Sequence, residues 1–107
     1  MSAGEVLAPE AVDEEIERRG LRWRRDGDML VTDVRLGSFR AALAYVQSVG
    51  ELAEAMDHHP DIDIRWRTVT LRVTTHTAGG LTERDLLLAT RIDALGDDDG
   101  GVATHEA

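Results

Sequence analysis

The chain contains neither cysteine nor lysine among its 107 residues, and each absence removes a class of chemistry. A protein without cysteine has no disulfide, thiolate zinc site, iron–sulfur cluster or thiol nucleophile. A protein without lysine has no amine for Schiff-base catalysis and no lysine for a phosphate-binding loop, and all 12 basic residues here are arginine. These absences exclude mechanisms but assign no cellular compartment.

Positive charge and long apolar runs are also scarce. The 21 acidic residues outnumber the 12 basic ones and give a net charge of −9 at pH 7, which repels the phosphates of nucleic acids. The longest apolar runs, such as residues 41–46, are far shorter than the roughly 20 residues of a membrane-spanning helix. Residues 1–12 lack the basic start of a secretory signal. We therefore expect a cytoplasmic protein with no nucleic-acid and no membrane partner.

The length and the 42% share of hydrophobic residues predict one domain with one core. Residues 1–95 hold the periodic apolar segments, whereas residues 96–107 are rich in Asp and Gly and include His105. A segment of that composition buries too little apolar surface to order the chain. We expect a single domain over 1–95 and an acidic disordered tail over 96–107, in which His105 is solvated and has no function.

Periodicity and turn residues predict three helices and four strands. The helices are expected at 9–19, 38–59 and 82–95, with Ser38 and Thr82 as N-caps and Pro60 closing the second helix. The strands are expected at 21–25, 29–36, 62–66 and 69–73, the first two joined by an Asp-Gly-Asp turn. The order helix-strand-strand-helix-strand-strand-helix predicts an α+β domain, with helices packed on one face of a four-stranded antiparallel sheet.

Apolar periodicity also predicts which side chains face the core. In the long helix a stripe recurs at steps of mostly three and four residues: Phe39, Ala42, Leu43, Val46, Val49, Ala53 and Met56. In the last two strands the apolar residues lie at even positions up to Trp66 and at odd positions from Val69, which predicts a tight turn or a bulge between them. The second face of the sheet stays uncovered, and an uncovered face or edge predicts a symmetric homo-oligomer.

Three of the four histidines lie between positions 58 and 76 and carry most of the chemical information in the sequence. His58 and His59 are consecutive at the end of the long helix, and His76 follows a strand. Histidine donates and accepts protons near neutral pH. Glu54 lies one helical turn before His58 and Asp57 lies beside it, so the group suits acid–base catalysis.

Two other interpretations of these residues are weaker. A metal site would use histidine and carboxylate ligands, but adjacent histidines usually diverge and no helical spacing such as H-E-x-x-H is present. A serine hydrolase would need a nucleophile context such as G-x-S-x-G, whereas Ser38 and Ser48 are explained as a cap and a helix-surface residue. The metal site is therefore the main alternative to acid–base chemistry.

The same residues resemble the signature of a known family. Glu54 is followed after three residues by His58-His59-Pro60, and then by Trp66, His76 and Asp85 at intervals of five, nine and eight residues. This spacing is similar to that of the pterin-4a-carbinolamine dehydratases. The similarity extends over about 34–95 and includes Thr74-Thr75-His76 and Gly80-Leu81-Thr82-x-x-Asp85. The chain departs from the family at Ile62, Val34 and Leu36, where many relatives carry aromatic residues.

The resemblance implies an enzyme that removes water from 4a-hydroxytetrahydropterin and yields quinonoid dihydropterin. This reaction recycles the pterin cofactor of aromatic amino acid hydroxylases, and such a hydroxylase is the pathway partner that the resemblance suggests. The catalytic residues implied are His58, His59 and His76, with no metal and no other cofactor. The substrate-binding residues implied are Asp57, His58, His59, Thr74, Thr75, His76 and Thr77.

The family's fold agrees with the α+β prediction, and its members form dimers or tetramers. Some relatives act as dimerisation partners of a transcription factor or as assembly factors. A non-enzymatic interaction protein is therefore the alternative function. The complete set of three histidines favours the enzyme.

Within this interpretation we expect His58 and His76 to form the acid–base pair on opposite sides of the pterin, and His59 to orient the ring or its hydroxyl. For three further residues, we expect either a supporting role at the site or a purely structural role. Glu54 would set the tautomer of a histidine, Trp66 is a core residue or a pocket wall, and Asp85 has the capping-box spacing from Thr82. Thr74 and Thr75 likewise suit a strand as well as a pocket.

Overall fold

The computed structural model describes residues 4–96 and 104–105. The helices are α1 (Pro9–Arg18), α2 (Phe39–Met56) and α3 (Glu83–Leu95), and the strands are β1 (Arg24–Asp26), β2 (Met29–Arg35), β3 (Asp61–Arg65), β4 (Thr68–Val73) and β5 (Thr104–His105). Up to the end of α3 the order of elements is the predicted one. The chain thus alternates a helix with two strands, which brings both hairpins into one sheet.

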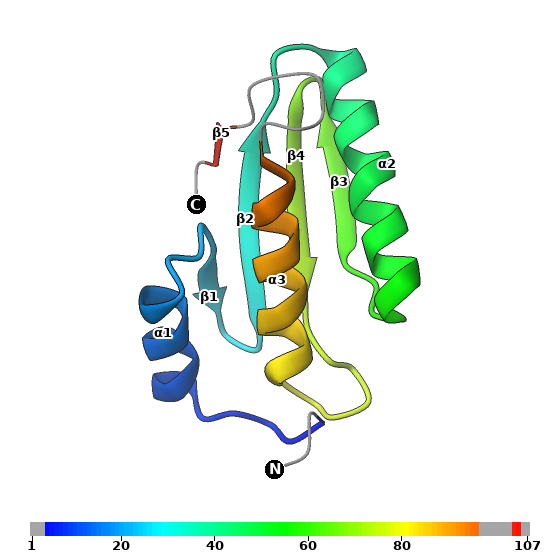
Figure 1. The fold of residues 1–107 in the computed structure, drawn as a ribbon. Helices are drawn as coiled ribbons and strands as arrows, with labels where there is room; N and C mark the ends of the chain where they lie inside the picture. The colour runs from blue at the N-terminus through cyan, green and yellow to red at the C-terminus, as the bar shows by residue number, and fades with distance from the viewer. Residues whose placement is uncertain (1–3, 97–103, 106–107) are drawn as a thin grey trace.

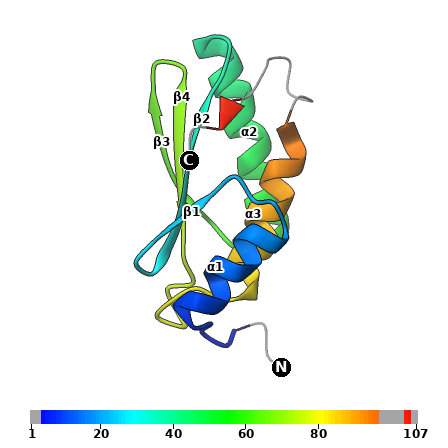
Figure 2. The same cartoon turned by 90° about the vertical axis from the view of Figure 1, so that its left-hand side faces the viewer.

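The strands form one antiparallel sheet in the order β1-β2-β4-β3, and β5 pairs with β2. The three helices lie on one face of this sheet, and no helix of the described residues covers the other face (Figures 1 and 2). The predicted α+β class is confirmed. The short strand β5 was not predicted, since it falls within the expected tail. Residues 97–103 and 106–107 lie outside the described part of the chain, so the disordered tail stays a prediction there.

The first hairpin confirms the predicted Asp-Gly turn. Asp26 pairs with Met29 across a two-residue turn in which Gly27 has φ +59°, a backbone conformation that glycine adopts without strain. β1 is shorter than predicted at its start. The amide of Arg22 donates to the Asp93 carboxylate on α3 at 2.9 Å, so it is not available to pair with a neighbouring strand.

The core lies between the sheet and the helices. α2 contributes Ala42, Tyr45, Val49 and Ala53, and the facing residues of β4 and α3 are Val69, Leu71, Val73, Leu86, Leu88, Ala89 and Ile92. The predicted stripe is wrong at Phe39 and Leu43, which are 49% and 47% exposed. α2 lies beside the edge strand β3, so that side of the helix extends past the sheet (Figure 1).

The turn between β3 and β4 explains the change of apolar phase. Arg65 pairs with Thr68, which leaves Trp66 and Arg67 as a two-residue turn with Trp66 at φ 54°. The predicted tight turn is therefore confirmed. Trp66 is 69% exposed, with the Arg67 guanidinium 4.7 Å from its ring centroid, and is not a core residue.

The uncovered face of the sheet is polar. Thr70 and Arg24 both donate to the Asp33 carboxylate, at 2.6 and 3.3 Å, and the hydrogen bond from Thr70, followed by that from Arg24, lowers the pKa of Asp33. Arg72 of β4 is exposed nearby, in register with Val31. This face is uncovered, as predicted. Because its side chains are mostly polar or charged, hydrophobic contact is not expected to drive self-association through it.

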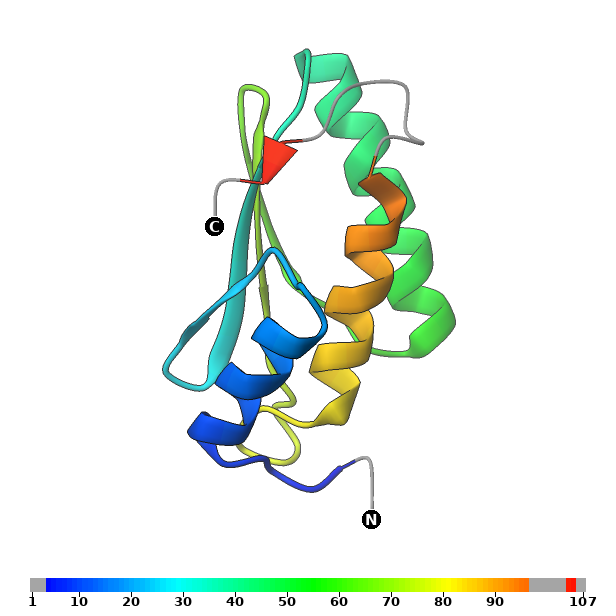
Figure 3. The ribbon, with the colours of Figure 1, turned by 60° about the vertical axis from the view of Figure 1, so that its left-hand side comes forward.

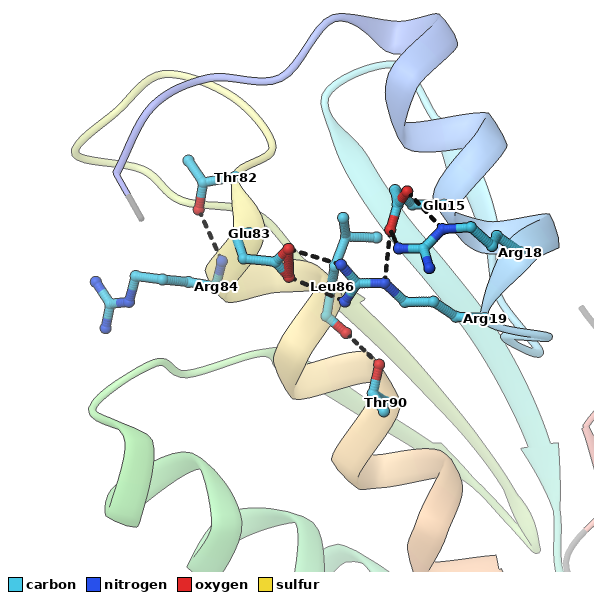
Figure 4. A network of polar contacts seen from close by, with 8 residues as sticks. All are labelled: Glu15, Arg18, Arg19, Thr82, Glu83, Arg84, Leu86 and Thr90. Atoms are coloured by element: carbon cyan, nitrogen blue, oxygen red, sulfur yellow. Dashed lines mark hydrogen bonds and ion pairs between the residues drawn. The ribbon is translucent and has the colours of Figure 1, made fainter. Parts of the chain in front are cut away.

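α1 is tied to α3 by a network of arginines and carboxylates. Arg19, just after α1, donates through both terminal nitrogens to Glu83 at 2.9 and 2.6 Å, and through Nε to Glu15 at 2.8 Å. Arg18 also binds Glu15. Figure 3 shows α1 beside the first turns of α3, and Figure 4 shows the network itself. The N-terminal helix thus anchors the start of α3, where the candidate site begins.

This network predicts acid-dependent stability. The hydrogen bonds from Arg18, and then Arg19, lower the pKa of Glu15 from its ordinary 4.5 to about 2. A carboxyl group whose pKa is lower in the folded state stabilises the protein above its unfolded pKa, and loses that contribution as the pH falls through the folded value. We expect the Glu15 contribution to be complete near neutral pH and to disappear between pH 4.5 and about 2.

Thermal unfolding of the wild type and Glu15→Gln at several pH values measures this effect. Glu15→Gln should unfold at a lower temperature near neutral pH, and the gap should close toward pH 2. Glu14→Gln, on the exposed side of α1, is the matched control. A gap between wild type and Glu15→Gln that stays constant across the acid range would contradict the prediction.

Candidate active site

His58 lies where α2 ends and is held in a buried position. Asp57 terminates the helix in the left-handed conformation, with φ 51° and ψ 46°, and turns the chain toward Pro60. The His58 amide donates to the Ala53 carbonyl at 3.0 Å. The His58 residue is only 6% exposed, and its Nε2 lies 2.6 Å from Oδ1 of Asp85. One ring nitrogen of a nearly buried imidazole is therefore committed to a carboxylate.

Asp85 serves the structure and the site at once. It is fully buried, and its Oδ2 accepts from the Thr82 amide and from the Thr75 hydroxyl, each at 2.8 Å. The first contact completes the predicted capping box of α3. The hydroxyls of Thr75 and Thr82 lie 2.9 Å apart. The sequence left open whether Asp85 supports the site or caps α3. Its contacts agree with both interpretations, because Oδ2 completes the capping box and Oδ1 faces His58.

His59 is paired with a different carboxylate. Its Nε2 lies 2.5 Å from Oε2 of Glu54, in the last turn of α2. Both side chains are exposed, at 55% and 77%. The two consecutive histidines thus point to separate acidic partners, one buried and one in solvent.

His76 is carried by the loop between β4 and α3. The Thr75 amide donates to the Gly80 carbonyl at 3.2 Å, and the amides of Ala78 and Gly79 donate back to the Thr75 carbonyl at 3.0 Å. Gly79 has φ +80°, which a residue with a side chain adopts only under strain. His76 lies in the resulting closed loop and is exposed to solvent.

These segments enclose a cavity of about 310 Å³. Its lining residues are Asp57, His58, His59, Thr74, Thr75, His76, Thr77 and Arg84. All seven residues expected to bind substrate therefore lie around one pocket, although positions 57–59 and 74–77 are separate in the sequence. The cavity is within the size range of small-molecule sites.

The remaining expected residues lie at different distances from this pocket. Asp85 is behind His58, and Glu54 is beside His59. Trp66 lies in the turn before β4, at the opposite end of that strand from the pocket. The six residues of β4, at about 3.3 Å each, separate Trp66 from the pocket by about 20 Å. It therefore does not line the pocket.

Sequence reasoning missed Arg84. A signal was present, because a cation in the first turn of a helix opposes the helix dipole and calls for an explanation. Its Nη2 donates to the carbonyls of Asp57 and Met56, at 2.6 and 3.3 Å.

Residues 4–96 and 104–105 hold no group of three or more histidine or carboxylate side chains arranged to bind a metal ion. In the same part of the chain, every helix is too short or too polar to cross a membrane.

The fold and the pocket define a small α+β protein with three histidines around one cavity, two of them beside a carboxylate. The family model for pterin 4 alpha carbinolamine dehydratase matches residues 5–95. A protein of Roseiflexus sp. (strain RS-1), provisionally named a pterin-4-alpha-carbinolamine dehydratase, is 51% identical over 92 residues, covering 83% of this chain and 99% of its own. A Nocardia farcinica (strain IFM 10152) protein with the same provisional name is 58% identical over 73 residues, covering 68% and 77%. The chain belongs to the pterin-4a-carbinolamine dehydratase family.

Two solved structures are similar in fold. The transcriptional coactivator/pterin dehydratase from Brucella melitensis superposes with a TM-score of 0.78 at 23% identity, covering 85% of this chain and 98% of its own. A pterin dehydratase-like protein identified as a RuBisCO assembly factor in the alpha-carboxysome superposes with a TM-score of 0.57 at 26% identity, covering 70% and 87%. Proteins with this fold thus carry both enzymatic and interaction names.

Proposed function

We propose that the protein dehydrates 4a-hydroxytetrahydropterin to quinonoid dihydropterin by histidine acid–base catalysis. The observation that carries the proposal is the convergence of His58, His59 and His76 on one cavity, with His58 held by a buried carboxylate. The substrate class follows from membership of the family.

The reaction needs one base and one acid. The base removes the proton from N5, the N5 electron pair forms a double bond to C4a, and the C4a–O bond breaks as an acid protonates the leaving hydroxyl. Water is released and no nucleophile or redox partner is required. A positioned acid or base contributes about 10²- to 10⁴-fold to such a step.

His58 suits the role of base. The Asp85 carboxylate accepts a hydrogen bond from Nε2 of His58, which keeps the proton there and leaves the lone pair on Nδ1. Because the residue is nearly buried, its ring orientation is set before substrate arrives. We assign removal of the N5 proton to Nδ1 of His58.

His76 and His59 complete the assignment. His76 also lines the pocket, on the loop after β4, and we assign it the proton that leaves with the hydroxyl. Glu54 fixes the tautomer of exposed His59, which we assign to orienting the pterin. Thr77 also lines the pocket, whereas the hydroxyl of the lining residue Thr75 is engaged by Asp85 and Thr82.

This mechanism predicts activity without a metal. Chelator-treated protein should accelerate formation of quinonoid dihydropterin from enzymatically generated 4a-hydroxytetrahydropterin as well as untreated protein does. The measurement is the rate of absorbance change after mixing, with a buffer-only reaction as control. Activity that vanishes with the chelator and returns with zinc would replace the acid–base mechanism by a metal site.

An interaction role is the second candidate, and one surface favours it. Phe39, Leu43 and Ile62 are exposed on the flank formed by α2 and β3, where residues of both elements line a hollow of about 760 Å³. Exposed apolar side chains gathered on one flank are typical of a protein-binding surface. The assembly-factor name of one similar structure fits the same idea. A chain that binds pterin but gives no turnover would favour this role.

We also propose that the protein is a cytoplasmic homodimer or homotetramer that acts in the pathway of an aromatic amino acid hydroxylase. Among the described residues β3 is an edge strand of the sheet, paired on one side only, and it adjoins the apolar flank of α2. The flank and the edge, rather than the polar sheet face, would contact a second copy.

Sedimentation at micromolar concentration measures the assembly. We expect a particle of at least twice the 11.8 kDa chain mass. Ile62→Arg, which places a charge on the flank, should shift the particle toward monomer, whereas Arg72→Gln on the open sheet face should not. A wild-type monomer would contradict the proposed assembly.

A further inference from the structure

Arg84 occupies an unfavourable position for a cation. It is the second residue of α3, directly after Glu83, where the helix dipole presents partial positive charge. A residue that opposes a local preference is expected to have a compensating role elsewhere. Figure 4 shows its side chain directed away from the Glu83–Arg19 pair, so it takes no part in that network.

The compensating contacts are at the end of α2. Nη2 of Arg84 donates to the Asp57 carbonyl at 2.6 Å and to the Met56 carbonyl at 3.3 Å. The last carbonyls of a helix have no partner within the helix, and a donor from another element satisfies them. Asp57 is also a non-glycine residue in the left-handed region, which has to be held there by its surroundings.

These contacts act on the same histidine as Asp85 does. The Asp57 carbonyl belongs to the peptide that joins Asp57 to His58, so Arg84 holds the backbone of His58. Asp85, the next residue of α3, holds the His58 ring. Two consecutive residues of one helical turn therefore hold the backbone and the ring of one histidine.

We propose that Arg84 is a positioning residue for the dehydration, which sets the His58–His59 turn relative to the loop that carries His76. This inference rests on the proposed function for its catalytic consequence. Misplacing a catalytic group by about 1 Å costs up to about 100-fold in rate. Loss of the guanidinium should therefore lower the dehydration rate of the folded protein. Arg84 would act through the position of the histidines and not through contact with the reacting atoms.

Arg84→Met tests the proposal, because it keeps an unbranched side chain and removes every donor. We expect kcat to fall about 10- to 100-fold. Arg84→Lys should recover part of the loss, since its ammonium donates to one carbonyl but lacks the planar fork. Arg91→Met, an exposed arginine of the same helix, is the matched control and should keep wild-type kcat.

Two further measurements separate positioning from general stability. Circular dichroism establishes that each variant is folded at the assay temperature, and kcat is compared only among folded variants. The side-chain ¹⁵N signals of His58 and His59 should shift in Arg84→Met and stay in place in Arg91→Met. If Arg84→Met does not fold, Arg84→Gln takes its place in both measurements.

A folded Arg84→Met with kcat within about twofold of the control and unshifted histidine signals would overturn the proposal. A wild-type protein without dehydratase activity would instead refute the proposed function. The histidine signals would still decide whether Arg84 positions the turn, because that readout does not depend on turnover.

Discussion

Replacing His58 or His76 by alanine is expected to lower kcat by about 10- to 10⁴-fold while the KM for the pterin changes little. The physical reason is that proton transfer stabilises the transition state only, so its loss affects turnover more than ground-state binding. Steady-state kinetics on the two variants measures the effect.

His59→Ala separates binding from chemistry in the same assay. If His59 orients the pterin through contacts made equally in the ground state and the transition state, its loss raises KM more than it lowers kcat. His105→Ala is the matched control, since it makes the same substitution at the histidine that the family motif does not include. Equal losses of kcat in His58→Ala, His59→Ala and His76→Ala would contradict the assigned division of roles.

Asp85→Ala is expected to lower both the free energy of unfolding and kcat. The substitution leaves the Thr82 amide, the Thr75 hydroxyl and Nε2 of His58 without their acceptor in a buried site. Buried groups left unpaired and a lost helix cap together cost about 2–4 kcal/mol. Denaturant unfolding gives the stability, and kcat is measured under conditions where the variant is folded.

Thr82→Ala is the control that separates the effect of Asp85 on stability from its effect on kcat. It removes the capping hydroxyl of α3 but keeps the Asp85 carboxylate beside His58. We expect a loss of stability of about 0.5–2 kcal/mol, with kcat changed far less than in Asp85→Ala. If Thr82→Ala and Asp85→Ala lowered kcat equally, Asp85 would act on the rate through the fold alone.

Most of the fold could be predicted because its elements have strong local signals. The Asp-Gly turn predicts the first hairpin, and the change of phase between Trp66 and Val69 predicts the second turn. The stripe on α2 was predicted less well, because apolar residues cover more of the helix than the sheet can bury. Which side faces inward depends on where α2 lies relative to the edge strand, and the periodicity of one helix carries no information about that.

The candidate site could likewise be predicted only in part from the sequence. The grouping of His58, His59 and His76 around one pocket could be predicted, since their spacing resembles a family motif. The contacts of Arg84 and the second oxygen of Asp85 could not, because they join the start of α3 to the end of α2 across the fold. Trp66 belongs to the same motif but lies in a turn away from the pocket, so membership of a motif does not establish proximity.

The most direct test of the central claim is the turnover of 4a-hydroxytetrahydropterin by the double variant His58→Ala/His76→Ala. Neither residue belongs to the hydrophobic core cluster, so we expect the double variant to fold and to sediment like the wild type. We expect it to unfold at a lower temperature, because the buried Asp85 carboxylate loses its His58 partner. We expect a folded protein whose dehydration rate is close to that of buffer alone. A folded double variant that keeps wild-type turnover would contradict histidine acid–base catalysis.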